Sequence, residues 1–186
     1  DGHVAQVTHD GRWVVVTSSR GTDERYAVHT IDLRRAMRSG DWSATALIAD
    51  MENEWSLVEG IGNRLWFITD KDAPKKRLMT VTLGRRAPVW RELVAQREAT
   101  LDRASIVGDR IVLSYLVNAS TTAELVSLTG RPLQNIRLNA IGTAGGFGGE
   151  PGDPETFYAF ASFNQPAAIY RLNLRNGETT TFAEPK

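Results

Sequence analysis

The chain has 186 residues, which is enough for one domain with a buried core or for one and a half. Hydrophobic residues make up 41% and charged residues 24%, as in ordinary soluble globular proteins, and 22 Lys and Arg balance 22 Asp and Glu. This balance excludes a global field that would attract nucleic acid or an anionic membrane surface. Because there is no cysteine, disulfides, thiolate metal sites and a cysteine nucleophile are also excluded.

The ends of the chain and its apolar runs say little about its compartment. No apolar run approaches the roughly 20 residues needed to span a bilayer. No signal peptide is visible, and the sequence opens at Asp1 rather than at a methionine. We therefore expect a mature or excised piece of a longer protein, and cytoplasm and periplasm both remain open.

The first quarter of the chain contains four short apolar runs separated by turn residues. They are VAQVTH (4–9), DGRWVVVTS (10–18), RYAVHTIDL (25–33) and ATALIAD (44–50). Alternation with a period of two over so few residues predicts strands. A helix-like stretch, LRRAMRSG (33–40), separates the third run from the fourth.

The same succession of runs recurs three times along the chain. The second set is WSLVEGI (55–61), GNRLWFITD (62–70), KRLMTVTL (76–83) and WRELVA (90–95). The third is RASIVG (103–108), GDRIVLSYL (108–116), AELVSL (123–128) and PLQNIRL (132–138). The fourth is TAGGFGG (143–149), DPETFYAFAS (153–162), AAIYRLNL (167–174) and ETTTFAE (178–184). VAQREA (94–99) is a second helix-like stretch, and Pro166, which lacks an amide donor, is expected in the last strand connection.

The spacing of these sets predicts a repeat of four short strands. The equivalent positions Arg12, Arg64, Arg110 and Thr156 lie 52, 46 and 46 residues apart. Four strands in about that length are typical of a β-propeller blade. We therefore predict an all-β fold, a partial β-propeller over residues 1–186 with blades at about 1–52, 53–98, 99–141 and 142–186. The four blades could close as a small ring or form part of a larger one, and a β-sandwich with coincidental spacing is the alternative.

Few residues are candidates for chemistry. The histidines, His3, His9 and His29, show no helical i, i+4 pair and no carboxylate cluster at ligand-like spacing, so no metal site is predicted. The segment TSSRG (17–21) only approaches a nucleophile elbow, because it lacks the first glycine and no helix follows. Ser19 is therefore predicted to be a serine at a strand end, and we predict no catalytic residue and no cofactor in this chain.

Two further segments have compositions that are found in binding sites, but their patterns do not predict binding. The glycine-rich GTAGGFGGEPGD (142–153) lacks the nucleotide-binding patterns and precedes a strand, so we predict a crowded inner strand near a propeller axis. Basic residues cluster around Pro74 without interleaved aromatic residues, which predicts a solvated hairpin tip and no nucleic-acid partner: Lys71, Lys75, Lys76 and Arg77.

Arg20 stands at the end of the predicted strand WVVVTSS, before Gly21 and Thr22. A guanidinium at a strand end on a blade rim could hold a carbonyl or carboxylate through two hydrogen bonds. A solvent-exposed or ion-paired arginine is the alternative at this position.

At three of these strand pairs the sequence resembles the propeller domain of the prolyl oligopeptidase family. The segments are DGRWVVVTSSRGTDERYAVHTIDL (10–33), WSLVEGIGNRLWFITDKDAPKKRLMTVTL (55–83) and FYAFASFNQPAAIYRLNL (157–174). The second carries an aromatic-x-T-[DN]-x-x-A-P-x-x-R-L core, and the third a turn of the form SF-x-x-P. The resemblance covers nearly the whole chain.

The resemblance implies a seven-bladed ring of which this chain is approximately the last four blades. In this family the propeller covers an α/β-hydrolase domain of the same parent chain, which holds the catalytic serine, aspartate and histidine. The expected function is substrate gating in a serine peptidase that cleaves short peptides after proline. The segment alone is not expected to be active, and its expected partners are proline-containing peptides and the hydrolase domain, with no membrane.

The resemblance also suggests one substrate-binding residue. The family has an arginine at the end of the strand matching WVVVTSS, shortly before a glycine and a small residue, and it contacts the peptide backbone. Arg20 is the candidate, although here it directly precedes Gly21, and Ser19 and Thr22 are weaker candidates. The competing hypotheses are a non-enzymatic propeller that binds a partner and, more distantly, a metal-dependent hydrolase.

Overall fold

The computed structural model describes residues 2–84, 86–138 and 140–185. Asp1, with which the first predicted blade begins, lies outside the described residues. The chain divides into two compact units, Asp1–Ala95 and Gln96–Lys186, called here the first and the second unit. Among the described residues, no helix is long and apolar enough to cross a membrane.

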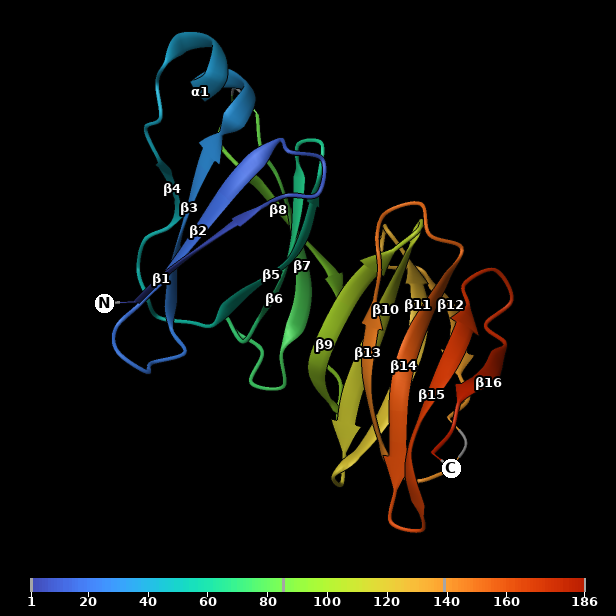
Figure 1. Ribbon diagram of the computed structural model, residues 1–186. Coiled ribbons are helices and arrows are strands. Elements are labelled where there is room, and N and C mark those ends of the chain that lie inside the picture. The colour runs from blue at the N-terminus through green and yellow to red at the C-terminus, as the bar shows by residue number, and fades with distance from the viewer. Residues whose placement is uncertain (1, 85, 139, 186) are drawn as a thin grey trace. The chain divides into compact units, whose positions relative to one another are not determined.

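Each unit contains two antiparallel sheets of four strands (Figure 1). The first unit holds β1 (Gly2–Val7), β2 (Trp13–Ser19), β3 (Tyr26–Asp32), β4 (Thr45–Ile48), β5 (Trp55–Ile61), β6 (Arg64–Thr69), β7 (Arg77–Thr82) and β8 (Val89–Val94). The second unit holds β9 (Thr100–Val107), β10 (Arg110–Val117), β11 (Ser120–Ser127), β12 (Pro132–Ile136), β13 (Thr143–Gly148), β14 (Glu155–Ser162), β15 (Gln165–Asn173) and β16 (Thr179–Ala183). In every sheet, the strands pair in the order in which they occur in the sequence.

Short turns fix the register of these sheets. Gly62-Asn63 joins β5 to β6 and Gly108-Asp109 joins β9 to β10, with Ile61 paired to Arg64 and Val107 to Arg110. Gly62 and Gly108 have φ of 60° and 58°, which a glycine adopts without the clash that a Cβ would cause. Two of the glycines that marked the start of a repeat in the sequence, Gly62 and Gly108, therefore lie in two-residue hairpin turns, whereas Gly11 lies in the longer connection between β1 and β2.

One helix is present among the described residues, and its ends follow from local chemistry. α1 (Leu33–Ser39) begins after Asp32, whose side chain accepts a hydrogen bond from the Arg35 amide. It ends at Gly40, which has φ 73° and donates its amide to the Ala36 carbonyl. The helix expected at residues 33–40 is confirmed.

Two local predictions are wrong. The stretch 94–99 is not helical, because Val94 ends β8, pairs with Leu78 and is buried, so sheet pairing overrides helix propensity there. Pro166 is not in the connection but is the second residue of β15. The pairing register shifts between Phe160 and Ser162 opposite this point, and such an irregularity accommodates a residue without an amide donor.

The core of each unit lies between its two sheets. In the first unit it is rich in tryptophan, and Trp55 packs on Trp90 with 4.9 Å between ring centroids. In the second unit a stack runs through Phe147, Tyr158 and Tyr170, with centroid separations of 4.7 and 5.4 Å. Burying sheet faces against a neighbouring sheet is how a propeller blade is stabilised.

Candidate functional site

Arg20 lies directly after β2, on the loop that leads to β3. Ser19 is the last residue of β2, paired with Gly2 on one side and Tyr26 on the other, and no helix follows it. Arg20 and Thr22 are exposed. The structure thus confirms the strand end that the sequence predicted, and it leaves the substrate-binding role of these residues a prediction.

A network of polar contacts shapes this loop. The Asp23 amide donates to the Arg20 carbonyl at 3.1 Å, and Gly21 has φ 60°. Arg25 Nε donates to both oxygens of Asp23 at 2.9 Å. This side-chain hydrogen bond is the main reason why the pKa of Asp23 is lowered to about 2, and the charge of Arg20 contributes in the same direction. The Asp23–Arg25 pair therefore holds the turn, while Arg20 stays outside it.

The Arg20 loop shares one end of the first unit with two other connections. Because strands alternate in direction, residues 20–25, 49–54 and 70–76 all lie at this end, which we call the Arg20 end. The Tyr26 amide donates to the Asn53 carbonyl at 3.0 Å, and Lys76 Nζ lies 2.8 Å from Glu54 Oε2. The loops are thus tied together beside Arg20, as a rigid support for a binding residue requires.

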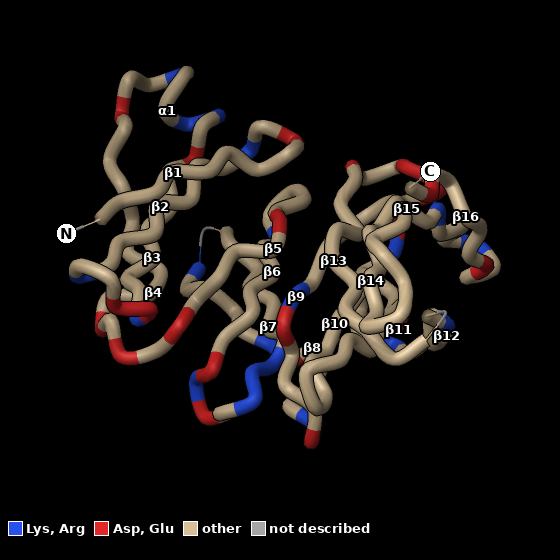
Figure 2. Tube along the Cα trace, turned by 60° about the horizontal axis from the view of Figure 1, so that its bottom comes forward, with Lys and Arg blue, Asp and Glu red and all other residues tan. Residues whose placement is uncertain are grey.

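The basic cluster around Pro74 is not simply a solvated tip. Lys76 pairs with Glu54, and Arg77, the first residue of β7, lies 2.9 Å from Glu92 and 3.7 Å from Asp72. Figure 2 shows that this loop carries both negative and positive residues, whereas the neighbouring strands carry few charges. Sequence spacing could not reveal Glu54 and Glu92 as partners, because they come from another connection and another strand.

Arg20 differs from these cations. Its guanidinium makes no hydrogen bond or ion pair with the other residues that the structure describes, and its side chain is solvent-accessible. A guanidinium presents five donors in a planar fork that suits a peptide carbonyl or carboxylate. The arrangement can therefore hold a peptide-like acceptor, and it offers no group for bond cleavage.

Other candidate chemistry is incomplete among the described residues. His3 Nδ1 and Ser18 Oγ are 2.8 Å apart across β1 and β2, the distance of a serine–base pair. No carboxylate among the described residues bonds to His3, and Ser18 lies mid-sheet rather than on a strand-to-helix turn. Within residues 2–84, 86–138 and 140–185, no three histidine, aspartate or glutamate side chains are grouped to hold a metal ion.

The glycine-rich segment forms β13, an edge strand of the fourth sheet. Crowding is real at Gly142, where a Cβ would lie 2.2 Å from the Ala161 carbonyl oxygen, and at Gly149, where it would meet Val107. Gly145 and Gly148 have open space within the described chain. The predicted crowding therefore holds for part of this segment, and the predicted axis is not tested.

Sequence reasoning missed an ion pair in the second unit between the exposed Arg97 and the largely buried Glu124. Glu124 Oε1 accepts from the Tyr115 hydroxyl at 3.0 Å and lies 2.9 Å from Arg97 Nη2. Burial is the main cause of the raised pKa of Tyr115, followed by the negative charge of Glu124. These residues line a cavity of about 480 Å³. Glu124 was the available signal, because it is the one charged residue in the strand STTAELVS.

Fold and site together define a propeller-type domain of sequential four-stranded sheets without a catalytic centre in its described residues. The chain matches the model of the prolyl oligopeptidase N-terminal β-propeller domain over residues 2–185. It belongs to this family.

Named relatives agree with this assignment. A prolyl endopeptidase of Elizabethkingia miricola is 28% identical over 181 residues, which are 97% of this chain and 25% of the relative. The prolyl endopeptidase of Elizabethkingia meningoseptica is 26% identical over 183 residues, with 98% and 25% covered. The chain therefore spans about a quarter of the length of these relatives.

Solved structures extend the comparison. One, from a structural and mechanistic study of two prolyl endopeptidases, superposes with a TM-score of 0.89 at 37% identity and covers 99% of this chain and 26% of that one. Prolyl oligopeptidase B from Galerina marginata superposes with a TM-score of 0.88 at 16% identity, covering 99% and 27%. The second likeness is one of fold alone.

Proposed function

We propose that this chain is approximately the last four blades of the seven-bladed propeller of a serine peptidase that cleaves short peptides after proline. The observation that carries the proposal is the family match over residues 2–185, together with relatives named prolyl endopeptidase of which the chain spans about a quarter. Hydrolysis would use a serine nucleophile and an oxyanion hole in an α/β-hydrolase domain of the same protein. The propeller would admit short peptides and exclude folded proteins.

The outer face of the last sheet supports a partial ring. β14 and β15 bury Tyr158 and Tyr170 on one face, while Phe157, Ile169 and Phe182 are 38%, 43% and 64% exposed on the other. Phe157 and Phe182 also contact each other edge to face at 5.0 Å. Exposed apolar side chains grouped on one sheet face are typical of a surface that a partner covers, and a further blade of the ring would be that partner.

The outer face of the first sheet has the same character. Val7 on β1 pairs with Val14 on β2 and is 61% exposed, and Val16 follows two residues later on the same face. With an apolar outer face on its first and on its last sheet, the chain would be flanked on both sides by further blades of the ring. The blade boundaries at about residues 52, 98 and 141 are part of this proposal.

Arg20 would supply ground-state binding of the peptide backbone. It stands at the end of β2 with its guanidinium unpaired by the other described residues, on a loop held by Asp23 and Arg25. Ser19 lies inside the sheet pairing, and Thr22 offers only a hydroxyl, so both remain weaker candidates. No residue of this chain would take part in bond cleavage.

Steady-state cleavage of a chromogenic Gly-Pro substrate by the full-length protein tests the proposal. We expect Arg20→Ala to raise KM by about tenfold with little change in kcat, because the loss of ground-state binding affects KM alone. Arg131→Ala removes the same charge from an exposed position of the second unit and serves as the control. Equal KM values for native protein and Arg20→Ala would remove Arg20 from the site, and no cleavage by folded protein would favour a non-enzymatic binding propeller.

The partial ring has a separate test. Size-exclusion chromatography of the isolated 186-residue segment should show self-association through the open faces. A stable monomer would instead indicate a closed four-bladed ring. Phe157→Ser and Phe182→Ser together should reduce the association if the outer face of the last sheet is responsible.

A further inference from the structure

The end of the first unit opposite the Arg20 loop collects arginines. It is formed by the β1–β2 turn at residues 8–12, by α1, by the turn Gly62-Asn63 and by residues 84 and 86–88, and we call it the arginine end. Its arginines are Arg12, Arg34, Arg35, Arg38 and Arg86. They come from three separate connections, so only the fold brings them together.

A cavity of about 660 Å³ opens among these residues. Arg12, Arg35 and Arg38 line it together with Asn63 and Asp32. A smaller adjoining cavity of about 190 Å³ shares Asp32 and Arg35 and adds Arg86. All of these residues belong to the first unit, and Asp32 is the single carboxylate among the residues lining the two cavities.

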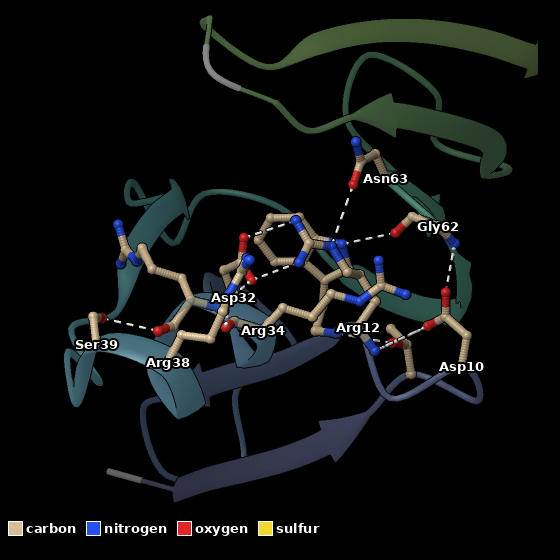
Figure 3. Close-up of polar contacts among 11 residues, drawn as sticks. Asp10, Arg12, Asp32, Arg34, Arg38, Ser39, Gly62 and Asn63 are labelled. Atoms are coloured by element: carbon tan, nitrogen blue, oxygen red, sulfur yellow. Dashed lines mark hydrogen bonds and ion pairs between the residues drawn. The ribbon is translucent and has the colours of Figure 1, made fainter.

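Asp32 does not neutralise the other arginines that line the cavity, because both of its carboxylate oxygens are paired with Arg12. Arg12 Nη1 and Nη2 donate to the two Asp32 oxygens at 2.7 and 2.8 Å, and its Nε reaches Asn63 Oδ1 at 3.4 Å (Figure 3). Their side chains are 16% and 22% exposed. This bidentate pair is fixed and electrically balanced, so Arg12 forms an ordered wall of the cavity.

Arg35 and Arg38 supply positive charge that Asp32, the carboxylate in the cavity lining, does not balance. They are three residues apart on α1 and therefore project from neighbouring positions of the helix. Outside the lining, Arg35 forms a loose ion pair with the exposed Asp41. Arg35 Nη2 has only long contacts, 3.3 and 3.4 Å to Ser43 and 3.6 Å to Asp41. Arg38 donates its Nε to the Arg34 carbonyl at 3.0 Å, which leaves its two terminal nitrogens without a partner among the described residues.

We infer that the arginine end binds a compact, multiply charged oxyanion, with Arg35 and Arg38 as its principal contacts and Arg12 and Asn63 as the wall. Guanidinium groups match both phosphate and carboxylate oxygens through paired N–H donors. A ligand with two or more charges gains from several guanidinium groups at once. The cavity has room for a diphosphate or a tricarboxylate, and this site is separate from the Arg20 end.

The aromatic lining of the cavity disfavours nucleic acid as the ligand, and Trp42, which is 57% exposed, lies outside that lining. Trp13 lies in the cavity wall but is only 8% exposed, and its indole nitrogen is bonded to the Gly62 carbonyl at 2.9 Å. Single-stranded nucleic acid is held by exposed aromatic rings on which bases stack. The charge of this site therefore favours a small anion that needs no stacking platform.

Isothermal titration of the full-length protein with diphosphate and, separately, with citrate tests the inference. We expect binding of at least one of them, weakened about tenfold or more in the double variant Arg35→Gln/Arg38→Gln, because charge-assisted hydrogen bonds are lost. Tighter binding of diphosphate would identify a phosphate ligand, and tighter binding of citrate a carboxylate ligand. Absence of binding of both to native protein at millimolar concentration would overturn the inference.

A control variant distinguishes specific binding at the arginine end from nonspecific attraction of anions to the protein's positive charge. Arg131→Gln/Arg175→Gln changes the net charge by the same amount at two exposed residues of the second unit, whose backbone amides alone bond to Ser127 and Asn173. It should leave the affinity unchanged. Equal weakening in both double variants would show nonspecific attraction and overturn the inference, and circular dichroism of both would verify that they are folded.

Discussion

The two units join their sheets by different means. In the first unit, side chains make most of the connections: Asp10 accepts from the Gly62 amide at 2.7 Å, Trp13 donates to the Gly62 carbonyl at 2.9 Å, and Glu59 accepts from the His9 amide at 3.1 Å. In the second unit, backbone groups bond directly, from Gly108 to Glu150 at 2.9 Å and from Thr121 to Gly142 at 2.8 Å.

Because of this difference, two units with equivalent sheet packing need not be equally sensitive to substitutions and to acid. Backbone hydrogen bonds survive most substitutions, whereas a carboxylate that bonds to a neighbouring sheet depends on one side chain and on its ionisation. We therefore expect the first unit to respond to single substitutions and to acid more than the second. Their cores, by contrast, should be equally sensitive, because both are close-packed between sheets.

The largest effects should come from the cores and be alike in both units. Phe67 in the first unit and Phe160 in the second are 0% and 1% exposed. Replacing either with alanine should lower the free energy of unfolding by about 3–5 kcal/mol, because burial is lost and a cavity remains. Urea unfolding of the full-length protein measures this, and a difference of several kcal/mol between the two variants would break the expected equality.

The next largest loss of stability is expected at the arginine end, and it should exceed the loss at the Arg20 end. Asp32→Ala removes the cap of α1 and leaves the largely buried Arg12 guanidinium without its partner. We expect a loss of about 2–3 kcal/mol in the free energy of unfolding. Asp23→Ala, which breaks the more exposed pair with Arg25, should change stability little, and a similar loss in both variants would contradict this account.

In the second unit, removing one side chain from the hydrogen bonds between the two sheets should lower stability by a smaller amount. Thr121 Oγ1 accepts from the Ala144 amide at 3.0 Å, while the Thr121 amide donates to the Gly142 carbonyl. Thr121→Val keeps the backbone bond and removes the hydroxyl, so it should cost about 1–2 kcal/mol for the unsatisfied amide. Hydrogen exchange should then accelerate at Ala144 while the Thr121 amide remains protected; loss of protection at both would show that the side chain carries the tie.

The smallest expected effect is the loss of stability when acid protonates Asp10 in the first unit. Partial burial opposes ionisation of Asp10, but hydrogen bonds from the Gly62 amide, the Thr8 hydroxyl and the Arg12 amide outweigh it and lower its pKa. The stabilisation is thus present above the unfolded-state pKa of about 3.9 and lost as pH falls through the lower folded-state value.

Asp10→Asn should therefore cost about 1 kcal/mol at pH 7, and the difference from native protein should vanish below the folded-state pKa. Thermal unfolding of both proteins between pH 2 and 7 would measure it. Asp109→Asn is the control, because Asp109 is 78% exposed and, among the described residues, its ion pair is with its neighbour Arg110. A constant difference across the whole pH range would exclude Asp10 ionisation as the cause.

The sequence predicted the sheets well because their signals are local. Alternation and paired turn residues placed sixteen strand-forming runs, and all sixteen strands overlap them. Phe147 shows where local signals end. It stands among glycines, yet it has φ 58°, is 2% exposed and stacks on Tyr158. A positive φ is unusual for a bulky side chain. The pattern of surrounding small residues therefore could not reveal that Phe147 fills the core.

The candidate sites were predicted to different extents. The position of Arg20 at a strand end could be predicted because a strand end is a local feature, while its substrate-binding role stays a prediction. The arginine end was missed because Arg12, Arg38 and Asn63 are far apart in the sequence and meet only when β1–β2, α1 and β5–β6 converge. The pair of Arg97 and Glu124 was missed because residues 94–99 were assigned to a helix, which hid the reach of Arg97 toward β11.

Every sheet of this molecule is built from strands that follow one another directly in the chain. No hydrogen bond within a sheet has to wait for a distant segment, so a sheet is complete as soon as about fifty residues have left the ribosome. Synthesis would thus add one finished blade after another, each offering its apolar face to the next. A pause in translation between two blades would then leave a paired, ordered intermediate rather than an unstructured chain.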